Sequence, residues 1–218
     1  MAVPNQPKIY HILHVDRLES VLADGGLWSD AMVQRHECEG TLIGMSSIKE
    51  RRLKTPLTSH PALKVGECVP FYFCPRSIML YLIFQANHPE LTYQGGQRPI
   101  IHLEADLQAS VKWAEAKDRR WAFTLSNAGS AYFEDRAEIN QLGEINWDAV
   151  AADQWSGNGV DRSIKEGKQA EFLIEESFPW GLVERIGVCS QGIYQQVAGL
   201  LTGKSHRPRL EILREWYY

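Results

Sequence analysis

The sequence lacks a hydrophobic run long enough to cross a membrane, although 44% of its 218 residues are hydrophobic. Residues 1–8 are polar and do not form the apolar core of a secretory signal peptide. We therefore expect a cytoplasmic protein without membrane contacts. No segment rich in proline, glycine and serine divides the chain, so we predict a single domain over residues 1–218. We also expect a monomer.

Neither sign of charge dominates, because 27 acidic and 23 basic residues give a formal net charge of −4. This balance argues against a protein that binds nucleic acid through its overall charge. It does not exclude a local basic patch, and the basic residues between positions 49 and 54 offer one.

Cysteine is scarce, with four residues at positions 38, 68, 74 and 189 and no C-x-x-C pair. A metal site is not expected, since His36-Glu37-Cys38 fits a solvated loop better than a zinc site. In a reducing compartment these thiols are most simply free. No G-x-G-x-x-G follows a predicted strand and no Walker motif is present, so a Rossmann site for a dinucleotide is not supported.

The segments that do show a pattern are strands and helices in no regular alternation, which predicts an α+β fold. Strands are predicted at residues 8–14, 69–73, 99–103, 121–124, 171–174, 183–188 and 209–212. Helices are predicted from Asp16 to Gly25, and at 78–85, 106–117, 134–142, 147–154 and 191–201. Residues 29–68 are expected to form a long charged loop, and residues 178–180 are expected to form a turn.

The segment Lys168–Ile174 is the most informative. Side chains two apart on a strand share a face, so Gln169 and Glu171 are expected to point into the same space. Such a pair suits a site that holds a sugar hydroxyl and stabilises a cationic sugar carbon, as when the nicotinamide–ribose bond of NAD+ breaks. Taken alone, the pattern is weak, and a surface glutamate at a strand start explains it better.

Five blocks of sequence add specificity to this pattern. They are Ile9–Ile12, Val69–Ser77, Tyr93–Gln97, Lys168–Leu173 and Arg214–Tyr218. Together they resemble the DarT family, the toxins of DarT–DarG toxin–antitoxin systems. The resemblance implies an ADP-ribosyltransferase-like fold, with central split mixed β-sheets flanked by helices. It also implies transfer of ADP-ribose from NAD+, a consumed co-substrate, to a base in single-stranded DNA, with thymine favoured, and the antitoxin DarG as partner.

The resemblance assigns the catalysis to Glu171 and Arg52. A carboxylate beside the ribose stabilises its positive charge and takes the proton of the attacking base. A guanidinium is permanently charged and offsets charge on phosphates or on the base. The simpler alternative for Arg52 and its neighbour Arg51 is a solvated basic loop.

The resemblance also implies which residues hold NAD+. These residues are His11, Ile12, Leu13, Tyr72 and Gln169. The backbone of Ile12 and Leu13 would pair with the nicotinamide amide, and Tyr72 would stack on its ring. Leu13 stands where many members carry threonine, a change that a backbone role tolerates. A core histidine, a core aromatic and a solvated glutamine are the alternatives for His11, Tyr72 and Gln169.

DNA contacts are expected from the basic residues and from one helix start. These are Lys49, Arg51, Lys54, Arg76 and Ser77. Asn127 marks a departure, because some relatives carry histidine near this position. Three alternatives stay open: a guanine-specific DNA enzyme, an ADP-ribosyltransferase acting on protein or RNA, and a catalytically silent nucleic-acid-binding module.

Overall fold

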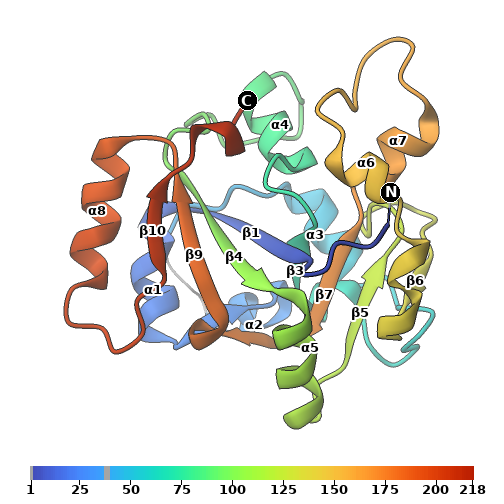
Figure 1. The fold of residues 1–218 in the computed structure, drawn as a ribbon, viewed down its shortest axis with the longest axis horizontal. Coiled ribbons are helices and arrows are strands. Elements are labelled where there is room, and N and C mark those ends of the chain that lie inside the picture. The colour runs from blue at the N-terminus through green and yellow to red at the C-terminus, as the bar shows by residue number, and fades with distance from the viewer. Residues whose placement is uncertain (1, 37–39) are drawn as a thin grey trace.

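An eight-stranded sheet forms the centre of the computed structural model, which describes residues 2–36 and 40–218 (Figure 1). The strand order is β10-β9-β4-β1-β3-β7-β5-β6, and all neighbours are antiparallel except the parallel edge pair β9–β10. The strands are β1 (Lys8–His14), β3 (Cys68–Tyr72), β4 (Ile100–Asp106), β5 (Trp121–Thr124), β6 (Asp135–Arg136), β7 (Glu171–Glu175), β9 (Val183–Val188) and β10 (Arg209–Ile212). A separate pair joins β2 (Gly26–Trp28) to β8 (Ser177–Pro179). Glu37 and Cys38, considered above with His36, lie outside the described residues.

Short helices surround the sheet (Figure 1). The α-helices are α1 (Leu18–Ala23), α2 (Asp30–Arg35), α3 (Ser46–Arg52), α4 (Ile78–Gln85), α5 (Leu107–Ala116), α6 (Trp147–Ala151), α7 (Arg162–Gly167) and α8 (Gln191–Leu201). The 3-10 helices are η1 (Val15–Arg17), η2 (Val65–Glu67), η3 (Ile139–Glu144), η4 (Trp180–Leu182) and η5 (Arg214–Trp216). No helix of the described ranges is long and apolar enough to cross a membrane.

Side-chain caps fix several helix starts where the sequence predicts them. Ser77 accepts a hydrogen bond from the backbone N–H of Leu80 at 3.3 Å, and Asp106 accepts one from Ala109 at 2.9 Å. Each cap satisfies a backbone donor that the first helical turn leaves unpaired. The predicted α+β fold and the predicted helices at 78–85 and 191–201 are confirmed.

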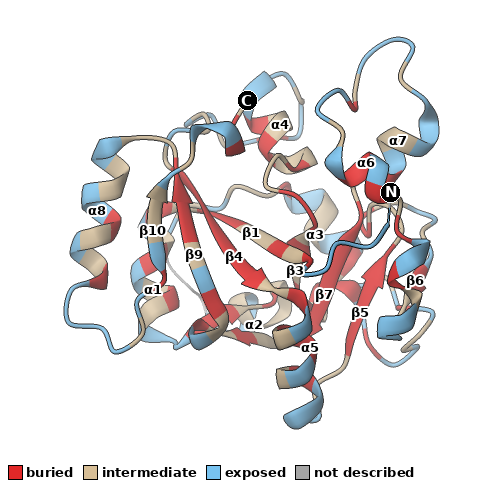
Figure 2. Cartoon of the chain, viewed as in Figure 1, coloured by how far each residue is buried: buried red, intermediate tan, exposed pale blue. Residues whose placement is uncertain are grey.

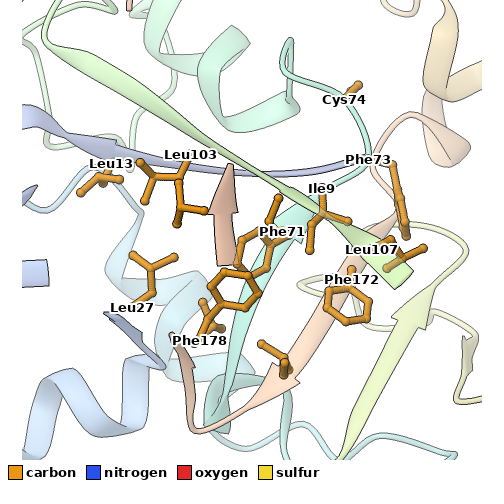
Figure 3. Close-up of a cluster of buried hydrophobic side chains, with 14 of the residues drawn as sticks. Ile9, Leu13, Leu27, Phe71, Phe73, Cys74, Leu103, Leu107, Phe172 and Phe178 are labelled. Carbon is orange, nitrogen blue, oxygen red and sulfur yellow. The ribbon is translucent and has the colours of Figure 1, made fainter. Parts of the chain in front are cut away.

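The core lies on both faces of the central strands, which are buried along most of their length (Figure 2). Phe71 of β3, Phe172 of β7 and Phe178 of β8 are fully buried and pack together (Figure 3). The centroid of the Phe71 ring lies 4.6 Å from that of Phe178 and 6.3 Å from that of Phe172. Burying one such ring contributes about 2–3 kcal/mol. Because Phe172 follows Glu171, this packing also fixes the start of β7.

The sheet splits between β1 and β3. β1 pairs with β4 along its whole length, from Lys8 to His14, but its register with β3 is the single pair Tyr10–Tyr72. Beyond Tyr10 the edge of β1 that faces away from β4 has no strand partner among the described residues. This split agrees with the predicted central split sheet, and residues 11–13 beside it line a cavity.

The prediction of a continuous loop over residues 29–68 is wrong. Helices α2 and α3 lie within it, and Arg52 is the last residue of α3. Both helices are short, and α2 begins at the Ser29 cap. Isolated helices of this length are marginal, so packing against the rest of the protein stabilises them, and a local sequence pattern carries little sign of it.

Two further predictions are also wrong. The helix predicted at 134–142 is replaced by β6 and η3, because the Asp135 carboxylate accepts hydrogen bonds from the backbone N–H groups of Thr58 and Ser59, both at 2.9 Å. The turn predicted at 178–180 is strand β8 followed by η4, since its backbone pairs with β2.

Candidate active site

A cavity of about 220 Å³ lies between the split in the sheet and the helices α1 to α4. Its wall brings together side chains that are far apart in the sequence, including His11, Arg52, Tyr72 and Glu171. Ile78, Met79 and Leu82 of α4 add an apolar wall. A mainly apolar cavity with a few convergent polar groups is the usual form of a small-molecule site.

Glu171 and Arg52 form a buried ion pair in this wall. Arg52 Nη1 donates to both carboxylate oxygens of Glu171, at 2.9 Å and 3.1 Å, across 119 residues of sequence. The Glu171 side chain is 3% exposed and that of Arg52 is 10% exposed. Arg52 Nη2 is also buried and has no hydrogen-bond partner in the structure. One nitrogen of this guanidinium is therefore unpaired, in a residue that lines the cavity.

The turn after β5 holds Glu171 in place. The backbone N–H of Ala128 donates to Glu171 Oε1 at 3.1 Å, and the backbone N–H of Glu171 donates to the Thr124 hydroxyl at 3.0 Å. Sequence reasoning missed Thr124 and Ala128, and no local motif marks them. The carboxylate is thus fixed by one guanidinium and one peptide N–H before any ligand binds.

Gln169, expected to point into the same space as Glu171, contacts the same turn after β5 but does not line the cavity. It precedes β7, and it is absent from the cavity wall. Its Oε1 accepts from Asn127 Nδ2 at 2.9 Å, and its Nε2 donates to the Lys165 carbonyl at 2.8 Å. Gln169 thereby orients Asn127, which does line the cavity, rather than reaching into it.

His11, Ile12 and Leu13 line the cavity along the unpaired edge of β1. Burial lowers the pKa of His11 to about 4, so the ring is neutral near pH 7. His11 Nδ1 lies 2.7 Å from the carbonyl oxygen of Pro70, a distance at which a neutral ring donates from that nitrogen. Ile12 and Leu13 are themselves buried, so they offer backbone groups to a ligand more readily than side chains.

Tyr72 joins the two halves of the site. It is the register partner of both Tyr10 on β1 and Glu171 on β7. Burial, and to a lesser extent the charge of Glu171, raise the pKa of Tyr72 well above its usual value. The phenol is therefore neutral and presents a ring and a hydroxyl to the cavity.

The basic residues in α3 and just after it differ in their exposure and in their partners. Lys49 lines the cavity and donates to Asp30 Oδ1 at 2.6 Å, so it is not a free surface cation. Arg51 and Lys54 are exposed. A side chain added at Gly129 would come within 3.8 Å of Arg51 Nη2, which places Arg51 beside the turn that holds Glu171.

Arg76 and Ser77 are less suited to the DNA contacts expected of them. The Ser77 side chain is fully buried as the cap of α4, so it has no surface to offer. The Arg76 guanidinium lies 4.4 Å from the ring centroid of Tyr218, and its Nη1 lies 3.7 Å from Asp153 Oδ1. Arg76 therefore holds the C-terminal segment against α4.

No group of three or more metal-ligating side chains occurs within residues 2–36 and 40–218. Cys68, Cys74 and Cys189 are free thiols, and burial raises the pKa of Cys68 to about 12. The chemistry that the cavity offers is electrostatic: a fixed carboxylate to stabilise a cationic centre, and a guanidinium to stabilise an anionic one.

Known proteins share this sequence and fold. The family model described as "ssDNA thymidine ADP-ribosyltransferase, DarT" matches residues 10–218. The chain is 34% identical to a DNA ADP-ribosyl transferase of Thermus sp. (strain 2.9), over 99% of this chain and 98% of that protein. It is 37% identical to one of Thermus aquaticus, over 100% of this chain and 92% of that protein.

Solved structures agree with these relatives. Thermus sp. 2.9 DarT in complex with ADP-ribosylated single-stranded DNA superimposes with a TM-score of 0.88 at 32% identity, covering 100% of this chain and 99% of that one. The same protein in complex with NAD+ gives a TM-score of 0.83 at 31% identity, covering 100% of both chains. The chain therefore belongs to the DarT family of NAD+-dependent DNA ADP-ribosyltransferases.

Proposed function

We propose that this protein transfers ADP-ribose from NAD+ to a thymine base in single-stranded DNA and releases nicotinamide. The buried Arg52–Glu171 pair in the cavity wall carries the proposal, because it places a fixed carboxylate and a permanent cation at one site. The family model described as a thymidine ADP-ribosyltransferase supports thymine as the base.

In the proposed reaction the bond between the nicotinamide nitrogen and ribose C1′ breaks, and its electron pair leaves with nicotinamide. The oxocarbenium-like ribose that develops is stabilised by the Glu171 carboxylate. A ring nitrogen of the base then bonds to C1′. In thymidine the ring nitrogen that is open to bonding carries a proton, so a base must accept this proton, and we assign this step to Glu171.

Arg52 would stabilise the negative charge that develops on thymine as its proton leaves. Its Nη2 nitrogen, which has no hydrogen-bond partner, suits this role, since Nη1 alone keeps Glu171 oriented. His11, Ile12, Leu13 and Tyr72 would hold the nicotinamide half of NAD+. The unpaired edge of β1 can supply the one N–H and one C=O that a carboxamide pairs with.

The base must leave a duplex to reach the cavity, which agrees with single-stranded DNA as the substrate. Arg51 and Lys54 are exposed, and Arg51 lies beside the turn that holds Glu171, so we assign contacts with the DNA backbone to both. Lys49 is engaged by Asp30 and serves the cavity instead. DNA binding through these cations would weaken as salt rises.

We further infer that the enzyme acts as a monomeric single domain and that an antitoxin of the DarG type counteracts it. Family membership supports the antitoxin, since a base-modifying enzyme that blocks replication templates harms its own cell. Co-purification of the two proteins, and removal of the mark by the antitoxin's macrodomain, would test this inference.

The direct test is the intact mass of mixed-sequence single-stranded oligonucleotides after incubation with NAD+. A gain of one ADP-ribose on thymine-containing DNA alone supports the proposal. A gain on guanine-containing DNA that lacks thymine would shift the specificity to guanine. NAD+ consumption without DNA modification would indicate a protein or RNA acceptor, and no NAD+ consumption would indicate a silent binding module.

A further inference from the structure

We propose that the guanidinium of Arg17 binds the pyrophosphate of NAD+ and positions the co-substrate in the cavity. The inference rests on the proposed use of NAD+ at this site and adds a residue that the sequence did not single out. Arg17 is the last residue of η1 and the N-cap residue of α1, and it lines the same cavity as Glu171.

Charge pairing distinguishes Arg17 from the other cations of the cavity. Three Lys or Arg side chains line the wall within the described residues: Arg17, Lys49 and Arg52. Lys49 is paired with Asp30 at 2.6 Å, and Arg52 with Glu171 at 2.9 Å. Arg17 has no ion pair within the part of the chain that the structure describes, and its buried Nη1 has no hydrogen-bond partner.

A buried cationic donor without a partner is unusual, because native proteins satisfy nearly all such groups. Because Arg17 also lines the cavity, an anionic ligand bound there would supply a partner for its charge. The ligand must be anionic and must fit a cavity of about 220 Å³. The pyrophosphate is the anionic part of NAD+, and a planar guanidinium matches phosphate oxygens in geometry and charge.

The neighbouring carboxylate is not available to neutralise Arg17. Asp16, predicted to cap a helix, instead accepts hydrogen bonds from the backbone N–H of Thr41 at 3.1 Å and from its hydroxyl at 2.7 Å. Asp16 Oδ1 also lies 2.8 Å from His14 Nδ1. These contacts tie Thr41 to η1 and engage the Asp16 carboxylate with partners other than Arg17.

The backbone at Gly40 also packs against the aliphatic part of the Arg17 side chain. A Cβ atom added to Gly40 would lie 2.7 Å from Arg17 Cγ, so only glycine lets the backbone approach so closely. Gly40 also has a φ of +110°, which favours glycine. Ser20 donates to the Arg17 carbonyl at 2.9 Å and fixes the backbone from the other side. The guanidinium is therefore placed before the ligand arrives, which reduces the entropy lost on binding.

The sheet sets the spacing between the two ends of the cavity. Glu171 is in register with Tyr72, and Tyr72 with Tyr10, so Glu171 lies level with Tyr10 two strands away. Four residues of β1 and two strand spacings separate Glu171 from His14 by about 16 Å between backbones. Arg17 follows His14 by three residues, so Arg17 and Glu171 line the cavity at well-separated positions, as the pyrophosphate and the nicotinamide ribose of NAD+ would require.

Calorimetric binding of ADP-ribose and of adenosine to Arg17→Gln, Arg17→Lys and the unaltered protein tests the proposal. We expect Arg17→Gln to weaken ADP-ribose binding about thirtyfold and adenosine binding less than twofold, because adenosine lacks phosphate. Arg17→Lys should recover part of the loss. Arg207→Gln, a change of an exposed arginine far along the chain, serves as the matched control.

Steady-state kinetics add a second readout. The KM for NAD+ should rise in Arg17→Gln while the KM for DNA stays unchanged. Equal ADP-ribose binding by Arg17→Gln and the unaltered protein would overturn the assignment, as would an equal loss for adenosine, which indicates a damaged cavity. Failure of the unaltered protein to bind NAD+ or ADP-ribose would instead overturn the proposed function, and the role of Arg17 with it.

Discussion

Two arginine–glutamate pairs involve carboxylates that are buried in this sheet, and the pairs differ in how completely they are satisfied. In the first pair, Arg185 of β9 donates to both oxygens of Glu104 of β4, through Nε at 2.8 Å and Nη2 at 2.7 Å. Its Nη1 donates to Glu211 at 3.1 Å, and its guanidinium lies 4.8 Å from the ring centroid of Trp216. This first pair is closed, and it lines no part of the cavity.

The second pair, Arg52 with Glu171, uses a single nitrogen for both contacts and leaves Arg52 Nη2 without a partner. It faces the cavity, whereas the first pair is covered by Trp216. Burial and charge alone therefore do not mark a reactive site. An incomplete hydrogen-bond shell beside a cavity does, and the two pairs should respond differently to the same substitution.

Glu171→Gln should have the largest effect. The change keeps the shape of the side chain but removes the charge that stabilises the ribose and accepts the proton. We expect the transfer rate to fall by about a thousandfold or more. Intact mass of a thymine-containing oligonucleotide measures the rate, and NAD+ binding measured in parallel shows whether the cavity is intact. A rate within tenfold of the unaltered protein contradicts the catalytic role.

Glu104→Gln should affect folding and not chemistry. Neutralising Glu104 leaves the partly exposed Arg185 guanidinium with Glu211 as its remaining carboxylate partner, which costs about 2 kcal/mol of unfolding free energy. Urea denaturation measures that loss. The transfer rate per folded molecule should stay within about threefold of the unaltered protein, and a much larger drop would show that the two pairs are coupled.

Arg52→Lys tests the geometry of the open pair. A lysine keeps the charge but loses the planar donor fork, so Glu171 and the base cannot both be contacted. We expect a loss of about thirtyfold in transfer rate, with NAD+ binding less affected. Full activity in this variant would show that only the charge of Arg52 matters.

Two buried histidines extend the comparison to pH. Burial lowers the pKa of His11, beside the open pair, and of His102, beside Trp216, each to about 4. Unfolding returns each ring to an ordinary pKa near 6.5, so the unfolded chain binds more protons between these values. Stability is therefore complete above neutral pH and is lost as the pH falls through 6.5 toward 4.

At pH 5.5 each histidine should cost about 1 kcal/mol of unfolding free energy relative to pH 7.5. Chemical denaturation at the two pH values measures the sum, and His102→Gln should remove about half of the difference. An unfolding free energy that does not change between these pH values would show that the rings do not titrate as their burial indicates.

Much of the fold follows from local sequence. Three kinds of signal act within a few residues: the alternation in residues 8–14, the Ser77 and Asp106 caps, and the apolar run after Glu171. The structure confirms the strands and helices that these signals predict. The helices within residues 29–68 and the extended backbone at Asp135 depend on partners far along the chain, so a local pattern cannot show them.

The candidate site divides in the same way. The sequence pattern and the family resemblance indicated Glu171, Arg52 and His11, and the fold brings all three to one cavity. Ala128 contributes only its backbone N–H, and the type of its side chain gives no sign of this role. Arg17 becomes informative only when the pairing of every other cation in the cavity is known.

The measurement that tests this account most directly is the rate at which Glu171→Gln and Glu104→Gln modify a thymine-containing single-stranded oligonucleotide, at equal concentrations of folded protein and saturating NAD+. We expect Glu104→Gln to remain close to the unaltered protein, while Glu171→Gln yields almost no ADP-ribosylated product. Comparable rates for the two variants, or a larger loss in Glu104→Gln, would contradict it.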